Sequence, residues 1–368
     1  MSGAFVFALC QTGAEAALKA EVATHRPAWR VAFQRPGLLT FKLPDDEAPP
    51  ALVGLTEGMA PRFGRLCGLS HGLAATPAEA ADRIRAVCGA SANLQVTVVE
   101  PGRPGEASDT RLAQAAALAQ AWTEALLGAL GPGFEAVDHA RPGATLCDVV
   151  LEPPRGRDGV ETMPRALIGT HVAGGVVLPG PGGRLALAMP PEAPSWAWRK
   201  CEEALALTGL RPRRGEAAIE LGASPGGAVV ALLARGIAVT AIDPQPMDPR
   251  VSAFAAARGV PLTVVTAAMA EVPLESLPTC VDWLLCDAHL AGPVALKGLG
   301  RYVRWYRDSL RGLLWTVKLH RWEDAARVDE LVARLRELGF AAVGARQLPS
   351  NRQELLVWGV TSRGLGAR

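Results

Sequence analysis

Four charged residues in the second half of the chain have types and positions that suit a catalytic crevice: Lys200, Asp287, Lys318 and Glu354. Asp287 and Lys318 each end an apolar segment that reads as a buried strand, and the carboxyl ends of neighbouring parallel strands line one ligand-binding edge of a sheet. Glu354 begins a later strand and reaches the same edge if that strand is antiparallel. Lys200 lies on the helix before the first strand. The plainer alternatives are a turn or helix-capping acid for Asp287 and a solvated strand end for Lys318.

A glycine-rich segment, IELGASPGG at 219–227, reads as the end of a buried strand, a tight turn and the start of a helix. Glycines at such a turn let the backbone approach a ligand closely. Asp243 ends the next strand, where an acid suits ribose hydroxyls. The dinucleotide spacing GxGxxG is absent, and Pro225 takes the place where that loop would meet a pyrophosphate. A nucleoside without phosphate, such as S-adenosylmethionine, therefore fits better than NAD; a purely structural turn is the alternative.

Strands and helices alternate from residue 216 onward, which is typical of a doubly wound α/β sheet. The expected strands are 217–221, 238–242, 261–265, 281–286 and 312–318, followed by 341–347 and 354–360. The last two are expected to form an antiparallel hairpin that closes the sheet. A helix at 196–210, with Ser195 as its N-cap, precedes the first strand.

The first half of the chain reads as a compact α+β module. A β-α-β-β unit is expected at 5–10, 14–23, 30–34 and 38–43, and then helices at 77–88 and 111–130 with strands at 94–100 and 144–151. A hairpin is expected at 166–170 and 172–178, and a polar loop at 101–109. The proline- and glycine-rich stretch at 179–183 is the best linker signal. We therefore expect a small unit at 1–48, a second domain at 49–178, a linker at 179–195 and the α/β domain at 196–368.

Composition narrows the class of protein. The 368 residues carry a net charge of +2 and are 49% hydrophobic, as expected of a globular chain with a sizeable core. The seven cysteines are scattered without CxxC spacing, which favours reduced thiols in the cytosol and neither disulfides nor a metal site. No apolar run is long enough to span a bilayer, and the first residues do not read as a signal peptide. We expect a cytoplasmic protein without a metal.

The order Lys–Asp–Lys–Glu, with ELGASPGG between its first two members, resembles the FtsJ-like (RrmJ-like) RNA 2′-O-methyltransferases. Several segments are more similar to one subfamily, the RlmM-type methyltransferases of a cytidine in large-subunit ribosomal RNA. These segments are 193–195 with KCEEA at 200–204, 220–227, Asp243 with 246–247, 286–287, VKL at 317–319, and ARQL at 345–348 with RQE at 352–354. The start of the chain resembles that subfamily more loosely.

The resemblance implies a fold, a cofactor and a substrate. It implies a Rossmann-like class I methyltransferase sheet with an antiparallel last strand, behind a ferredoxin-like unit and a THUMP-type RNA-binding domain. It also implies S-adenosylmethionine as cofactor and large-subunit rRNA, naked or precursor, as partner. The expected cofactor-binding residues are Glu220, Gly222, Ser224, Pro225, Gly226, Gly227, Asp243, Met269 and Asp287. Two positions depart from the family: Ala228 replaces an aromatic residue, and the stretch 266–269 lacks the acid that usually meets adenine, which leaves the backbone and Met269 to hold it.

In the expected mechanism Lys318 is the base that deprotonates a ribose 2′-hydroxyl. Lys200 would orient the ribose and help to lower the pKa of Lys318, Asp287 would position the amine, and Glu354 would hold the second lysine. The alternatives are a catalytically impaired RNA-binding protein of this fold, a 2′-O-methyltransferase of another RNA such as tRNA, and a nicotinamide oxidoreductase. The oligomeric state stays open.

Overall fold

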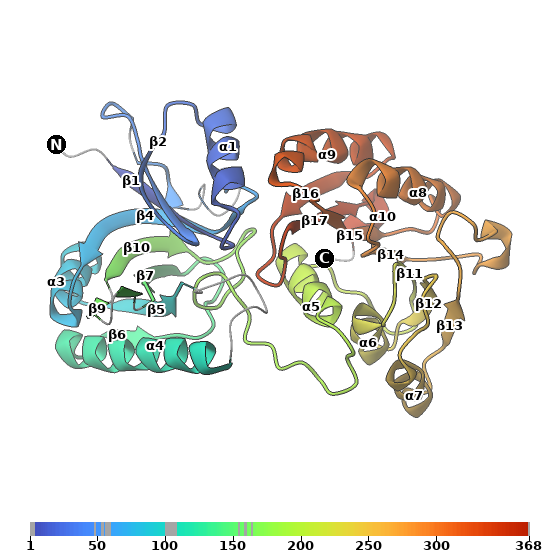
Figure 1. Ribbon diagram of the computed structural model, residues 1–368, viewed down its shortest axis with the longest axis horizontal. Helices are drawn as coiled ribbons and strands as arrows, with labels where there is room; N and C mark the ends of the chain where they lie inside the picture. Colours follow the sequence, from blue (N-terminus) through green and yellow to red (C-terminus); the bar gives the residue numbers. More distant parts are fainter. Residues whose placement is uncertain are drawn as a thin grey trace. The chain divides into compact units, whose positions relative to one another are not determined.

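The computed structural model describes residues 4–47, 49–52, 55, 60–99, 109–153, 155–157, 160–162 and 165–366. All but the last residue of the expected polar loop at 101–109 lie outside these ranges. The chain divides into two compact units, Met1–Ala186 and Leu187–Arg368 (Figure 1). The finer division into four segments stays a prediction.

The first unit is built on a mixed sheet of eight strands in the order β2-β3-β1-β4-β10-β7-β5-β6. These strands are β1 (Phe5–Cys10), β2 (Arg30–Arg35), β3 (Leu38–Lys42), β4 (Gly64–Ala74), β5 (Ala92–Val98), β6 (Phe134–Ala136), β7 (Thr145–Leu151) and β10 (Ala166–Val172). A separate hairpin joins β8 (Arg155–Arg157) and β9 (Val160–Thr162). The helices are α1 (Glu15–His25), α3 (Pro77–Cys88) and α4 (Asp109–Leu130). The predicted β-α-β-β start of the chain is confirmed as β1, α1, β2 and β3.

Successive residues of a strand point to opposite faces of the sheet, and each face of this sheet carries its own core cluster. Val149 and Ile168 pack with residues of α3 and α4 in one core cluster. Their neighbours Val150 and Leu167 belong to a second cluster, which includes Phe7 of β1. The assignment of this unit to ferredoxin-like and THUMP-type parts stays a prediction.

The hairpin expected at 166–170 and 172–178 does not form. A single strand, β10, runs through to Val172, and the chain then turns at Gly174 and Gly175, whose φ angles are +120° and +61°. Val177 and Leu178 are nevertheless buried. These two apolar residues pack in a turn. From the sequence alone, a short apolar segment buried in a turn cannot be told from a buried strand.

The second unit holds a seven-stranded sheet in the order β13-β12-β11-β14-β15-β17-β16. Its strands are β11 (Ala217–Leu221), β12 (Ala238–Ile242), β13 (Leu262–Val265), β14 (Trp283–Cys286), β15 (Gly312–Lys318), β16 (Ala342–Arg346) and β17 (Glu354–Val360). Strand β17 is antiparallel to both of its neighbours, and β11 to β15 are parallel. This confirms the predicted Rossmann-like sheet with an antiparallel last strand, since the strand order reverses between β11 and β14.

Helices cover both faces of this sheet. Figure 1 shows α5 (Ala197–Thr208), α6 (Gly227–Ala234) and α7 (Pro249–Arg258) on one side, and α8 (Gly292–Trp305) and α9 (Val328–Glu337) on the other. Short helical turns lie at η1 (Leu274–Ser276), η2 (Trp322–Arg327) and α10 (Ser362–Leu365).

Ser195 is not the N-cap of α5, contrary to the sequence prediction. Trp196 occupies the cap position without a side-chain hydrogen bond. The hydroxyl of Ser195 instead faces Gly227, where an added Cβ would lie 2.4 Å from Oγ. Close packing of the α5 start against the glycine turn therefore takes the place of a capping bond.

Candidate active site

The four charged residues singled out from the sequence meet at the carboxyl edge of the second sheet. Lys318 Nζ lies 2.5 Å from Asp287 Oδ1 and 2.6 Å from Glu354 Oε2. Lys200 Nζ lies 3.1 Å from Asp287 Oδ2 and 2.6 Å from Glu354 Oε1. Each lysine thus bridges the same two carboxylates. We call these four residues the charged tetrad; their catalytic roles stay predictions.

The pairing of the strands fixes three members of the charged tetrad. Lys318 is the last residue of β15 and lies directly opposite Glu354, the first residue of β17. Asp287 follows β14, whose Cys286 is in register with β15. A parallel bridge between Ala291 and Lys318 further ties the segment after β14 to the end of β15. Lys200 comes from α5, and its Nζ reaches both Asp287 and Glu354.

The contacts within the charged tetrad favour the ionised forms of Lys318 and Glu354. Burial alone would lower the pKa of Lys318, but the neighbouring Asp287 and Glu354 outweigh burial and raise this pKa above its usual value. Burial would raise the pKa of Glu354, but Lys200 and Lys318 outweigh it and lower that pKa. The two directions agree. In the free protein Lys318 is therefore an ammonium, which differs from the expectation that burial and Lys200 would help to neutralise it.

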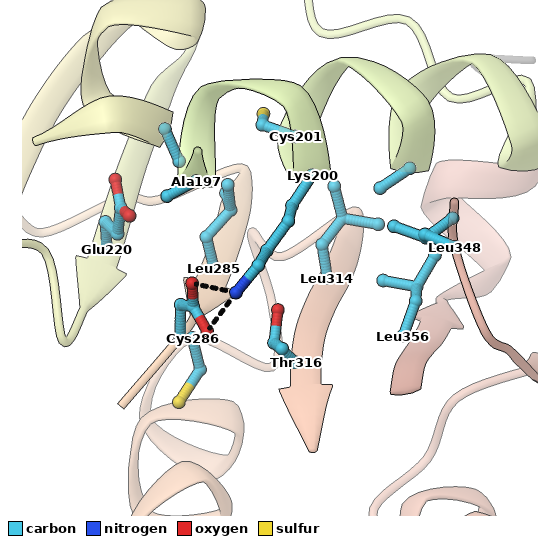
Figure 2. A pocket seen from close by; sticks show the side chains of 13 residues that line it. Ala197, Lys200, Cys201, Glu220, Leu285, Cys286, Leu314, Thr316, Leu348 and Leu356 are labelled. Carbon is cyan, nitrogen blue, oxygen red and sulfur yellow. Dashed lines mark hydrogen bonds and ion pairs between the residues drawn. The ribbon is translucent and has the colours of Figure 1, made fainter. Parts of the chain in front are cut away.

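A cavity lies beside the charged tetrad, and Figure 2 shows the residues around it. It is lined by Ala197, Lys200, Cys201, Ala204, Glu220, Ala228, Leu285, Cys286, Asp287, Leu314, Thr316, Leu348 and Leu356. Its wall is mostly apolar, with polar side chains from Lys200, Glu220, Asp287 and Thr316. Such a mixture of apolar wall and few polar groups is typical of a site for an organic ligand.

Glu220 is the one fully buried carboxyl among these lining residues, at 1% exposure. Its Oε2 has no hydrogen-bond partner among the described residues. Burial raises its pKa well above the usual value, and the nearby Asp287 and Asp243 raise it further. An unpaired buried carboxylate is costly, so burial favours the neutral acid. It is a polar group without a partner, and a bound ligand could supply one.

The glycines of the turn serve packing. Gly222 has φ of +77°, and an added Cβ would lie 2.5 Å from backbone atoms of Ala288, the residue after Asp287. Gly226 has φ of +114°, and its Cβ would lie 2.4 Å from Met247 Sδ. These glycines therefore let the turn sit directly against neighbouring segments, which adds a structural reason to the ligand approach expected from the sequence.

The remaining predicted cofactor residues lie around the turn or beyond it. Asp243 Oδ2 accepts from the backbone N–H of Ser224 at 3.1 Å, and its Oδ1 accepts from Gln245. The Ser224 hydroxyl donates to the carbonyl of Pro246, and the Pro225 carbonyl accepts from the Asp248 N–H. The turn and the end of β12 thus form one hydrogen-bonded unit.

Met269 lies apart from the cavity-lining residues, beyond β13. It is buried, its carbonyl accepts a 2.7 Å hydrogen bond from Tyr302, and its side chain packs toward Gly298 of α8. Its predicted contact with adenine stays a prediction.

Sequence reasoning missed several residues that support the site. Glu203, one turn after Lys200 on α5, accepts from the backbone N–H and the hydroxyl of Ser350 at 3.0 and 2.6 Å. Asn351 Nδ2 lies 3.5 Å from Glu354 Oε1. Thr316 lines the cavity two residues before Lys318, on the same strand face. Thr316 could have been found from the alternation of side chains along a strand, which places it on the same face as Lys318. Nothing in the sequence around Glu203 indicates that this residue holds the turn before Glu354.

Two features are absent from the described residues. No group of three or more His, Cys, Asp and Glu side chains in that part of the chain is arranged to hold a metal ion. In the same residues no helix combines the length and apolar character that a membrane crossing requires.

Comparison with known proteins identifies relatives over half of the chain. A protein of Halorhodospira halophila named "Ribosomal RNA large subunit methyltransferase M" is 35% identical over 183 residues, which are 48% of this chain and 50% of the relative. A protein of the same name from Tolumonas auensis is 29% identical over 194 residues, 50% of each chain. The chain thus matches about half the length of these relatives. No family model matches it.

Likeness to solved structures is weaker. TrmN from Thermus thermophilus is 17% identical with a TM-score of 0.36, over 97% of this chain and 99% of that one. The fold is therefore read from the strand order above. Over about half of its length, the chain is a relative of proteins named ribosomal RNA large subunit methyltransferase M.

Proposed function

We propose that this protein is an S-adenosylmethionine-dependent RNA ribose 2′-O-methyltransferase that acts on a cytidine of large-subunit rRNA. The observation that carries the proposal is the charged tetrad, two lysines and two acidic residues with contacts of 2.5 to 3.1 Å at the carboxyl edge of a Rossmann-like sheet. The names of the relatives supply the RNA class. The resemblance of the tetrad to FtsJ-like enzymes supplies the 2′-hydroxyl, and the resemblance of several segments to RlmM-type methyltransferases supplies the cytidine.

The residues at the glycine turn fit a nucleoside cofactor. Asp243 directly follows β12, at a place where a carboxylate suits ribose hydroxyls, and Glu220 offers a buried oxygen that lacks a partner among the described residues. S-adenosylmethionine would supply a methyl group on a positively charged sulfur. A cationic ligand near Glu220 would favour the ionised form of this carboxyl, whose neutral form burial favours in the free protein.

The charged tetrad would prepare the hydroxyl for attack. The 2′-oxygen forms the new bond to the methyl carbon as the bond from that carbon to sulfur breaks, and the hydroxyl proton passes to a base. Lys318 can be that base only after it loses its own proton. A substrate that displaces Asp287 or Glu354 from Lys318, or adds positive charge nearby, lowers its pKa toward that state. Lys200 and Glu354 would hold the ribose in position.

Substitution of Lys318 tests the base. Lys318→Ala should abolish methyl transfer, with cofactor and RNA binding nearly intact. Lys318→Arg should be equally inactive, because a guanidinium stays protonated. Transfer would be measured with labelled S-adenosylmethionine, and binding by calorimetry. Substantial transfer by Lys318→Arg would show that positive charge alone suffices and would exclude the base role.

The substrate is tested with total RNA from a strain that lacks the gene. The expected product after digestion to nucleosides is labelled 2′-O-methylcytidine from large-subunit rRNA. Label in tRNA would favour the second candidate substrate. Folded protein that binds RNA but neither binds S-adenosylmethionine nor transfers methyl groups would support the impaired RNA-binding protein. That alternative is motivated by the stretch 266–269, which lacks the acid expected near adenine.

A further inference from the structure

An exposed tryptophan stands one helical turn before Lys200. Trp196 is 43% exposed, and its carbonyl accepts the Lys200 N–H at 3.2 Å. The guanidinium carbon of Arg199 lies 4.9 Å from the centre of its indole ring. Arg199 Nε has no hydrogen-bond partner among the described residues. A large aromatic ring backed by a cation is thus left in solvent beside the charged tetrad, where covering it would bury much apolar area.

The chain topology places this ring at the catalytic edge. Helix α5 leads into β11 from its last turn, so its C-terminal end lies toward the amino ends of the parallel strands and its first turn lies toward their carboxyl ends. Ala197, the next residue, lines the cavity. Trp305 is a natural contrast: it is 46% exposed but ends α8, the helix that returns from the carboxyl end of β14 to the start of β15. Trp305 therefore lies at the opposite edge.

We propose that Trp196, supported by Arg199, is a stacking platform for an unpaired nucleobase of the RNA, either the target base or its neighbour. The inference rests on the proposed function, because it assumes an RNA substrate at the charged tetrad. Single-stranded bases stack on exposed aromatic rings, and an arginine stacked on the ring adds a cation for the phosphate backbone. Stacking would hold the ribose still while its 2′-hydroxyl faces Lys318 and Lys200.

The test compares substitutions at the two exposed tryptophans. Trp196→Ala should raise the KM for RNA by roughly 5- to 150-fold, the loss expected for one stacked base, and Trp196→Phe should restore most of the affinity. Trp305→Ala should leave the KM unchanged. S-adenosylmethionine binding, measured by calorimetry, should be the same in all three variants, which separates this inference from the proposed cofactor site.

A fluorescence titration gives a readout that is independent of catalysis. Short oligocytidylate should quench the emission of the wild-type protein and of Trp305→Phe. The quench should be much smaller in Trp196→Phe, and also smaller for wild type with an abasic oligomer of equal length. An equal quench in Trp196→Phe, or an unchanged KM in Trp196→Ala, would overturn the platform. If no variant binds RNA while S-adenosylmethionine still binds, both the platform and the RNA substrate are wrong.

Discussion

Glu220 has an environment unlike that of the other acids at the crevice. Glu354 contacts both lysines of the charged tetrad, whereas Glu220 is fully buried with an oxygen that lacks a partner in the described part of the chain. Its pKa is raised by burial first and then by Asp287 and Asp243. The neutral form therefore persists in the free protein above the pH at which an unfolded glutamate, with a pKa of about 4.3, is ionised.

Binding of a cationic cofactor should remove this proton. The folded pKa is raised, so free protein carries a proton that a nearby positive charge would expel. We expect binding of S-adenosylmethionine to release up to about one proton and to tighten as pH rises toward the raised pKa. Calorimetry in buffers with different ionisation enthalpies measures this release. In Glu220→Gln the release should vanish; an unchanged release would assign the proton to another group.

The free energy of unfolding of the ligand-free protein gives a second test of the Glu220 pKa. Because folded Glu220 holds its proton more tightly than the unfolded chain does, stability falls as pH rises from about 4.3 toward the folded pKa. Glu220→Gln should lack this decline. Urea unfolding of both proteins across that range compares them, and parallel curves would mean that Glu220 is ionised when folded.

At the scale of single residues, the sequence predicted which side chains lie together but not their protonation states. Asp287 and Lys318 could be found because each ends an apolar strand. The protonation state of Lys318 could not be predicted, because burial lowers its pKa while its carboxylate neighbours raise it, and only the distances in the structure show which effect is larger. Glu203 was missed for a related reason, since its partner Ser350 is 147 residues away.

The glycine turn links elements that are far apart in the chain. Gly222→Ala should destabilise the protein by about 2–5 kcal/mol, because a left-handed φ costs an L-residue roughly 1–2 kcal/mol and the clash with the Ala288 backbone adds about 1–3 kcal/mol. Gly209→Ala is the matched control: it has φ of +67° but nothing within 4 Å of an added Cβ. It should show only the first cost. The urea unfolding midpoints of the two variants measure their losses of stability. Equal losses in Gly222→Ala and Gly209→Ala would contradict the packing role of Gly222.

Regular elements were easier to predict in the second unit than in the first. Four of its parallel strands, β11, β12, β14 and β15, are buried on both faces and give continuous apolar runs. Strand β4 was not predicted, because Gly68 and Gly72 interrupt its sequence. An added Cβ at Gly68 would lie 2.3 Å from the Thr170 carbonyl oxygen of β10, so a glycine sits where two backbones approach closely.

At the scale of the whole molecule, the chain is two compact units with separate sheets. We expect a fragment of residues 187–368 to fold alone and to bind S-adenosylmethionine, since the charged tetrad, Glu220 and the glycine turn all lie within it. RNA affinity should fall in this fragment, because the first unit is the predicted RNA-binding part. Circular dichroism and calorimetry test folding and cofactor binding; a fragment that folds without binding the cofactor would place part of the site elsewhere.

The antiparallel strand β17 has a consequence for how this site can change. Lys318 and Glu354 face each other only because β15 and β17 pair in one register. A shift by one residue would send every β17 side chain to the other face of the sheet. If β17 shifts to absorb the change, loss of one residue in the turn before Glu354 would place Leu355 opposite Lys318, and gain of one residue would place Gln353 there, in each case instead of the carboxylate that we predict to be catalytic. Length variation, tolerated in most loops, is here as damaging as replacing the acid itself.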